Sequence, residues 1–243
     1  MNVIITGASS GIGRSTALEL LKFPGVRVVA ISRNSVKLSS LQEEAIRMGK
    51  GEFLRTYAGD ITSDAFISMV AAEVEKSGIG VQVLINNAGK LIHKAISELS
   101  REEWREVYDT NVFSTAAMIK HFLPLLKQNL PMENSVFQSH ILNIGSVGGV
   151  QGSVKFAGLS AYSSSKGAMS ILTECLAEEL KSERIAVNCL ALGSVQTEMF
   201  TAAFPGMEAS MKSAKMGQYI AEFAMHGHRF YNGKVLPVTF STP

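Results

Sequence analysis

The strongest constraint on the fold is a repeated alternation of short, uninterrupted apolar runs with longer stretches of helical pattern. The runs lie at residues 3–5, 26–31, 53–57, 81–85, 140–144, 185–190 and 235–238. Most are rich in Val, Ile and Leu, as are strands that are buried on both faces of a parallel sheet. Helical patterns separate them at residues 12–23, 36–48, 64–76, 101–127 and 162–181. The alternation predicts one α/β domain over residues 1–243, with a doubly wound parallel sheet of about seven strands flanked by helices.

The first strand runs directly into a glycine-rich turn, and a helical pattern follows. The residues of this turn that are expected to face a ligand are Gly7, Ser9, Ser10, Gly11, Ile12 and Gly13. Glycines here permit positive φ and let the backbone approach a pyrophosphate closely. The helix would offer the phosphates free N–H groups and the positive end of its dipole. A strand, this turn and a helix in that order predict a dinucleotide-binding Rossmann fold.

The end of the second strand indicates which dinucleotide is bound. Many NAD enzymes carry an acidic residue there, about 20 residues beyond the glycines, to hold the ribose hydroxyls. This chain has Ser32 and Arg33 instead. A guanidinium can form a charge-assisted, bidentate contact with a 2′-phosphate. We therefore expect NADP(H) to be preferred and NAD(H) to be the weaker cofactor. Arg14 is either a second phosphate contact or a surface helix residue.

Further motifs follow in order along the chain. They are Asp60-Ile61, Asn86-Asn87-Ala88-Gly89, Asn111, Ser146 and a Tyr162–Lys166 pair. Their order, together with the spacing of the glycine turn, resembles the short-chain dehydrogenase/reductase family over nearly the whole chain. The resemblance implies a nicotinamide-linked reaction of a carbonyl or alcohol group. It also implies that Asp60, with Ile61, meets the adenine, and that Asn87, Ala88 and Gly89 lie beside the adenosine ribose.

Tyr162 and Lys166 are expected to share one face of a helix, because residues four apart lie about one turn apart. A free tyrosine has a pKa of about 10 and is a poor base at neutral pH. A nearby ammonium should favour the phenolate and lower the pKa of Tyr162. Tyr162 would then donate a proton to a carbonyl oxygen in reduction, or accept one in oxidation. The resemblance adds that Lys166 binds the nicotinamide ribose.

Ser146 and Asn111 complete the expected catalytic set. Ser146 follows an apolar strand, at the carboxyl edge where open α/β sheets bind ligands. Its hydroxyl is expected to bond the substrate oxygen, more strongly as negative charge develops there. Asn111 falls inside a predicted helix, where its side chain is unfavourable. The resemblance implies that Asn111 holds a water that connects Lys166 to solvent; the alternative is a helix-kink residue satisfied by the backbone.

The segment after the sixth apolar run has two expected roles. Gly193, Val195 and Thr197 resemble the family's stretch beside the nicotinamide carboxamide, although Leu192 stands where the family commonly has proline. Residues of about 193–218 are expected to form a substrate lid. Its Met and Phe side chains would line an adaptable apolar pocket for a hydrophobic or aromatic ketone or aldehyde. The alternative is that Met207 and Met211, which stand at helical spacing, simply pack in a helix.

The leading hypothesis is therefore an oxidoreductase that transfers a hydride between NADP(H) and a carbonyl or alcohol, in the direction of reduction. The first alternative is a 3-oxoacyl-carrier-protein reductase-like enzyme. Its acidic carrier would need a basic patch near the lid, for which Lys212 and Lys215 are the local candidates. The second is a catalytically inactive dinucleotide-binding sensor or scaffold, disfavoured because a pure binder needs no Tyr162. A sugar epimerase or dehydratase is disfavoured by chain length.

Composition limits the partners. A net charge of +2 is too small to favour nucleic acid or an anionic membrane. No apolar run approaches bilayer-spanning length, and no secretory pattern opens the chain, so a cytoplasmic location is expected.

Cys175 and Cys189 are expected to be small buried hydrophobes, and no metal site is expected. The helical patterns at 101–127 and 162–181 are apolar over more than one stripe, which with the resemblance predicts a homodimer or homotetramer.

Overall fold

The computed structural model describes residues 1–78 and 80–240. Within them, seven parallel strands form the central sheet in the order β3-β2-β1-β4-β5-β6-β9. The strands are β1 Asn2–Thr6, β2 Arg27–Ser32, β3 Leu54–Ala58, β4 Val83–Asn86, β5 Ser139–Ser146, β6 Ile185–Leu192 and β9 Val235–Val238. The predicted doubly wound α/β fold is confirmed. The strand order reverses between β1 and β4, and open α/β sheets bind ligands at the carboxyl ends beside such a reversal.

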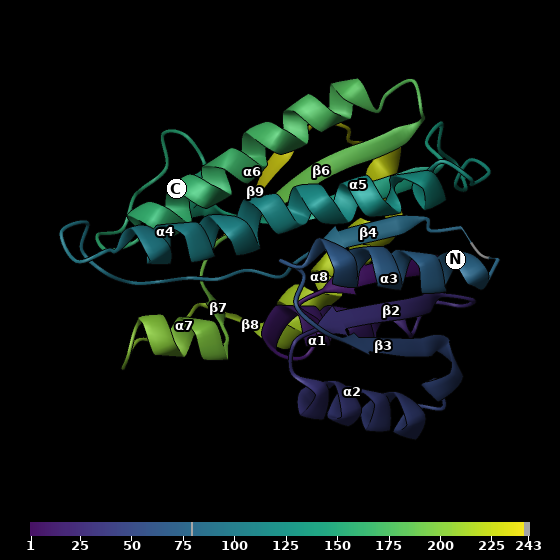
Figure 1. Ribbon diagram of the computed structural model, residues 1–243, viewed down its shortest axis with the longest axis horizontal. Helices are drawn as coiled ribbons and strands as arrows, with labels where there is room; N and C mark the ends of the chain where they lie inside the picture. Colours follow the sequence, from purple (N-terminus) through teal and green to yellow (C-terminus); the bar gives the residue numbers. More distant parts are fainter. Residues whose placement is uncertain (79, 241–243) are drawn as a thin grey trace.

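Helices cover both faces of the sheet (Figure 1). One face carries α1 Gly11–Leu20, α2 Ser35–Arg47 and α8 Ser213–His226; the other carries α3 Asp64–Lys76, α5 Ser114–Leu126 and α6 Ser160–Glu179. Adjacent residues of a strand serve opposite cores: Val3 and Ile5 pack on the α1 side, whereas Ile4 packs on the α3 side. Because both faces are buried, the strands are apolar without alternation.

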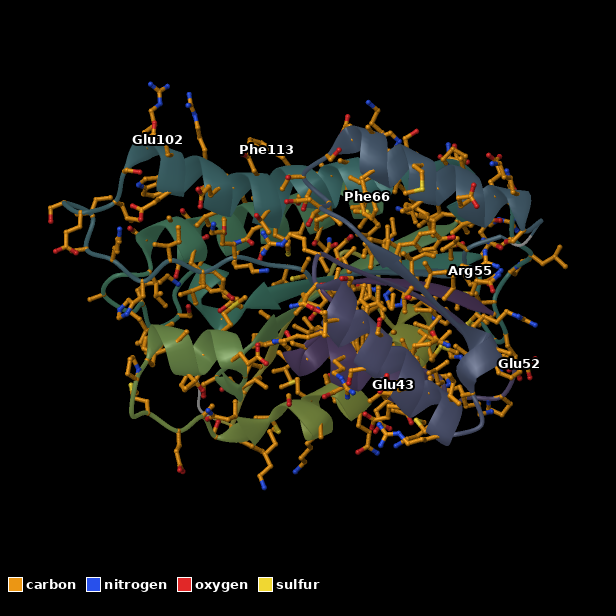
Figure 2. The ribbon with its side chains drawn as sticks, turned by 60° about the horizontal axis from the view of Figure 1, so that its bottom comes forward. Glu43, Glu52, Arg55, Phe66, Glu102 and Phe113 are labelled. Carbon is orange, nitrogen blue, oxygen red and sulfur yellow. The ribbon has the colours of Figure 1, made fainter. Side chains whose placement is uncertain are left out.

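A π-helical turn divides the helix predicted over residues 101–127. α4 Arg101–Tyr108 begins at a capping box formed by Ser100 and Glu103. The π turn covers Asp109–Phe113, and α5 continues to Leu126 with Pro124 in its last turn. Such turns insert one extra residue into a helix and are frequent at functional sites. This one buries Asn111 completely and leaves Phe113 on the outer surface (Figure 2).

The segment of about 193–218 that was expected to form a substrate lid overlaps α8, which already begins at Ser213. β7 Val195–Gln196 pairs with β8 Met211–Lys212, and α7 Glu198–Ala203 lies between them, beyond the carboxyl end of the sheet (Figure 1). Met207 lies in a loop and Met211 in β8, so the alternative that both pack in a helix is wrong.

Two smaller expectations can be compared with the structure. Cys189 is buried in β6 as expected, but Cys175 is exposed on α6, so its predicted burial is wrong. Within the described ranges, no helix combines the length and apolar character that a membrane span requires.

Candidate active site

A cavity of about 650 Å³ opens at the carboxyl ends of the strands. Every residue that the sequence analysis assigned to cofactor contact, from Gly7 to Thr197, lies in its wall. Ser146 also lines the cavity, whereas Asn111 is buried beneath it. One hollow therefore brings together segments from β1, β2, β4, β5, α6 and the chain after β6.

The glycine turn has the shape that a pyrophosphate requires. Gly7 and Gly11 have φ of +68° and +54°, which favour glycine. A Cβ on Gly13 would lie 2.3 Å from the Gly7 carbonyl oxygen, so only glycine fits there. Ser10 precedes α1 without a side-chain capping bond, and the first turn of α1 contains no acidic residue. The N–H groups at this helix start are thus left to an anion, and a dinucleotide phosphate fits the site.

Asn87 supports this turn from β4. Its Nδ2 donates to the carbonyl oxygen of Thr6 at 2.9 Å. The backbone N–H groups of Asn87 and Ala88 both donate to the Thr6 hydroxyl at 3.1 Å. The side chain that the resemblance places beside the ribose therefore also fixes the end of β1 against the end of β4.

Polar side chains line the end of the cavity that the sequence analysis expects to hold the adenosine. The Ser9 and Ser32 hydroxyls are 2.7 Å apart. Arg33 is exposed at the wall and has no ion-pair partner among the described residues. Arg14, in contrast, is paired with Glu44 at 2.7 Å and does not line the cavity. Of the two arginines, only Arg33 presents a free guanidinium to this space.

Asp60 follows β3 and accepts two hydrogen bonds from Thr62, from the backbone N–H at 2.9 Å and from the hydroxyl at 3.0 Å. The carboxylate is thereby fixed at the cavity wall, next to Ile61. Gly59, just before it, packs against Phe66 of α3, where a Cβ would lie 2.2 Å from the ring (Figure 2).

Ser146, Tyr162 and Lys166 meet at the inner end of the cavity. The Ser146 and Tyr162 side chains lie close enough to interact, and Ser146 Oγ accepts from the Gly148 N–H at 3.2 Å. Lys166 Nζ lies 5.9 Å from the centre of the Tyr162 ring and donates to the Ile144 carbonyl at 2.8 Å. The carbonyl of Ile144 is a contact that no sequence pattern could reveal, because it belongs to the backbone.

The pKa of Tyr162 departs from the sequence expectation. Burial raises it to about 12, and the hydrogen bond from Ser146 opposes this rise. Burial lowers the pKa of Lys166 to about 8. The expected lowering of the Tyr162 pKa is therefore wrong, because desolvation by burial outweighs the effect of Ser146. At neutral pH, Tyr162 is a neutral phenol and Lys166 is mostly an ammonium.

Asn111 is held at the π turn by three hydrogen bonds. Its Oδ1 accepts from the Lys90 N–H at 2.7 Å, and its Nδ2 donates to the Lys90 carbonyl at 3.0 Å and to Ser165 Oγ at 2.8 Å. A Cβ on Gly89 would lie 3.4 Å from Asn111 Oδ1 and 3.6 Å from Lys166 Nζ, so this glycine leaves space between the two side chains. The bonds to Lys90 and Ser165 were not foreseen from the sequence.

The chain after β6 is fixed without the family's proline. Leu192 remains in the sheet, paired with Ser146 and Val238, and the Gly193 N–H donates to the Val238 carbonyl at 3.0 Å. Val195 is buried in β7, and Thr197 caps α7 by accepting from the Phe200 N–H at 3.1 Å. Strand β9 thus fixes the backbone at Leu192 and Gly193.

The remaining wall is mostly apolar. It includes the side chains of Leu91, Phe156, Leu159, Met199, Phe204 and Met207. The Met and Phe side chains of residues 199–207 come from the segment that the sequence predicted as a lid. Leu91 and Phe156 come from two other loops, and the sequence analysis missed them because neither loop carries a recognisable motif.

These features define a class: a dinucleotide-dependent α/β enzyme whose neutral tyrosine faces an apolar pocket. The family model of the short chain dehydrogenases matches residues 1–208. The chain belongs to the short-chain dehydrogenase/reductase family, and the predicted membership is confirmed.

Similar proteins indicate the reaction class and the cofactor. An NADPH-dependent pterin aldehyde reductase of Arabidopsis thaliana is 36% identical over 214 residues, which cover 87% of this chain and 81% of that protein. The rhamnolipid-biosynthesis 3-oxoacyl-[acyl-carrier-protein] reductase of Pseudomonas aeruginosa is 31% identical over 219 residues, covering 89% and 82%. A solved variant of actinorhodin polyketide ketoreductase with NADPH has a TM-score of 0.82 at 26% identity, covering 98% of this chain and 95% of that chain. The comparisons support an NADP(H)-dependent oxidoreductase acting on C=O and CH–OH groups.

Proposed function

We propose that this protein reduces a hydrophobic or aromatic ketone or aldehyde with NADPH, and that Ser146, Tyr162, Lys166 and Asn111 are its catalytic residues. The observation that carries the proposal is that Ser146, Tyr162 and Lys166 lie together in the wall of one cavity. That cavity extends from the glycine turn to the apolar side chains around Phe204. A pterin aldehyde, the substrate class in the name of the Arabidopsis relative, is one aromatic aldehyde that suits such a pocket.

Bound NADPH would supply the hydride to the carbonyl carbon. The hydroxyls of Ser146 and Tyr162 would bind the carbonyl oxygen and stabilise its growing negative charge. Because the pKa of Tyr162 is raised to about 12, the phenol holds its proton until the alkoxide forms and then donates it. The Lys166 ammonium would stabilise the resulting phenolate. Asn111 would keep a path for a proton from solvent to Lys166, through the space beside Gly89.

The cofactor roles follow the cavity wall. The N–H groups at the start of α1 would bind the pyrophosphate, and Asp60 would receive the adenine amino group. Arg33 would bind the 2′-phosphate, which makes it the source of the preference for NADP(H) over NAD(H). Residues 193–212 would close over the nicotinamide and the substrate as a lid.

Calorimetric titration with NADPH and, separately, NADH tests the cofactor assignment. Arg33→Ala should weaken NADPH binding by about tenfold or more and leave NADH binding nearly unchanged, because a charge-assisted phosphate contact is lost. Arg14→Ala is the matched control, since Arg14 is paired with Glu44. Wild-type protein should also oxidise NADPH when benzaldehyde is added. Tighter binding of NADH, or equal effects of both substitutions, would contradict the assignment.

A 3-oxoacyl-carrier-protein reductase activity is the second candidate, favoured by the Pseudomonas relative. Lys212 is exposed on β8, and Lys215 lies 5.9 Å over the Phe240 ring. Neither lysine lines the cavity, so both would have to serve a carrier docked outside it. Faster NADPH oxidation with an acetoacetyl thioester than with benzaldehyde would favour this candidate. Cofactor binding without turnover of either would favour the inactive sensor or scaffold.

We further propose a single Rossmann-type domain, a cytoplasmic location and a homodimer or homotetramer. The exposed Phe113 on the π turn and the exposed Ile171 and Cys175 on α6 support an assembly, because together they form apolar surface on neighbouring helices. A monomeric mass by light scattering at micromolar protein would contradict it.

A further inference from the structure

The substrate end of the cavity contains an unpaired carboxylate. We define this end by Leu91, Phe156, Phe204, Met207 and Glu208. The other charged groups in the wall already have roles or partners: Arg33, Asp60 and Lys166 lie along the proposed cofactor path, and Glu198 is paired with Lys37 at 2.5 Å. Glu208 has no hydrogen-bond or ion-pair partner among the described residues. Among the described residues of this wall, it is the one charged side chain with neither a partner nor a proposed cofactor role.

The backbone on both sides of Glu208 is anchored. The Met207 N–H donates to the Phe204 carbonyl at 3.1 Å, and the Ala209 N–H donates to Gln196 Oε1 at 2.8 Å. Met211, two residues further on, pairs with Val195 in the β7–β8 ribbon. These contacts fix the backbone of Glu208 at the cavity wall.

Phe200 and Phe204 line the same cavity as Glu208, and the His93 ring packs against Phe204 without lining the cavity itself. The ring centroids of His93 and Phe204 are 5.1 Å apart, and those of Phe200 and Phe204 are 5.2 Å apart. His93 Nε2 also donates to the Ala157 carbonyl at 3.2 Å, since a carbonyl oxygen can only accept. The His93 side chain thereby joins the loop before α4, the loop before α6 and the segment after α7. Flat rings of this kind favour a flat, aromatic substrate.

We propose that Glu208 is a specificity-determining residue that selects aromatic carbonyl compounds bearing a positive charge or a hydrogen-bond donor remote from the carbonyl, and rejects those bearing an anion there. The inference rests on the proposed carbonyl reduction and adds the substrate class. Glu208 is exposed, so water partly screens its charge, but beside the apolar side chains of this wall its carboxylate still attracts donors and cations. An anionic group at the same place would be repelled and desolvated without a partner.

The test compares three aldehydes with NADPH at pH 7: benzaldehyde, para-(trimethylammonio)benzaldehyde and para-carboxybenzaldehyde. The measured quantity is the ratio of kcat/KM for the cation to kcat/KM for the anion. Glu208→Gln should lower this ratio by about tenfold and change kcat/KM for neutral benzaldehyde much less. The intrinsic reactivities of the aldehydes cancel when the ratio is compared between enzymes.

Glu198→Gln is the matched control, because it removes a carboxylate of the same segment that already has a lysine partner. It should change the ratio by less than about twofold. NADPH affinity measured by calorimetry shows whether Glu208→Gln is folded. An unchanged ratio in folded Glu208→Gln, with benzaldehyde still reduced, would overturn the role of Glu208 and leave the proposed carbonyl reduction intact. If wild-type protein binds NADPH but reduces none of the three aldehydes, both proposals fail.

Discussion

Acidification from pH 7 to pH 5 should destabilise the fold through two histidines that the proposed chemistry does not use. His140 of β5 and His228 are both buried, with ring centroids 5.7 Å apart. His140 Nδ1 donates to the Ala224 carbonyl at 3.0 Å, and Nε2 accepts from Asn188 Nδ2 at 3.1 Å. A carbonyl can only accept and an amide NH2 can only donate, so these bonds require a neutral ring. Protonation of His140 would turn Nε2 into a donor. It would then face the Asn188 Nδ2 donor, and the hydrogen bond between them would be lost.

The pKa values set the size of the effect. Burial lowers the pKa of His140 to about 4. It lowers the pKa of His228 to about 3, and the neighbouring His140, Arg229 and His226 act in the same direction. An unfolded histidine takes up a proton below about pH 6.5, whereas the folded His140 ring resists protonation until about pH 4. Stability is therefore lost as pH falls through this window. Between pH 7 and pH 5, His140 alone should lower the free energy of unfolding by ~2 kcal/mol.

Urea unfolding followed by circular dichroism at the two pH values measures this loss. The comparison variant is His140→Asn, whose amide can still donate to the Ala224 carbonyl but does not titrate. It should be less stable than wild type at both pH values, yet lose ~2 kcal/mol less between them. Carboxylates elsewhere contribute equally to both proteins and cancel in the difference. Equal losses in wild type and His140→Asn would refute the reasoning.

Three further outcomes follow from the site. Tyr162→Phe should lower kcat by about 10²- to 10⁴-fold while the calorimetric Kd for NADPH stays nearly constant, since the proton donor alone is lost; an undiminished kcat would exclude Tyr162 as the acid. Gly13→Ala should weaken NADPH binding by at least about tenfold, because its Cβ would lie 2.3 Å from the Gly7 carbonyl oxygen; unaltered affinity would mean that the turn can shift freely. Asn111→Ala should lower the free energy of unfolding by ~2–3 kcal/mol in urea, because it leaves buried partners unsatisfied; a loss below ~1 kcal/mol would contradict its anchoring role.

The sheet was predictable because buried parallel strands are apolar on both faces, as Val3, Ile4 and Ile5 illustrate. The helix α8 was not predictable from the sequence, and Gly217 shows the reason. A glycine in the middle of a helix lowers its propensity. Here it lets α8 approach α1 so closely that a Cβ would lie 2.6 Å from the Ser15 Cβ. The residue that obscures the helix in the sequence is the one that its packing requires.

The candidate site was likewise predictable only in part. The residues that local motifs assign to cofactor contact lie in one cavity, because the glycine turn and the Tyr162–Lys166 spacing each reflect geometry within a few residues. The apolar wall was found only in part, since Leu91 and Phe156 arrive from separate loops that only the folded chain brings together. The pKa of Tyr162 was predicted in the wrong direction, because spacing reveals a nearby ammonium but says nothing about burial.

The π turn at Asp109–Phe113 has a consequence for how this chain can vary in length. A π turn amounts to one residue inserted into an α-helix, with the flanking helices remaining coaxial. Deleting one residue there would restore an ordinary helix and leave α4 and α5 able to pack. It would also withdraw Asn111 from Lys90 and Ser165, which it now joins. Because the same hydrogen bonds also stabilise the fold, an enzyme shortened at this point should be both slower and less stable to urea.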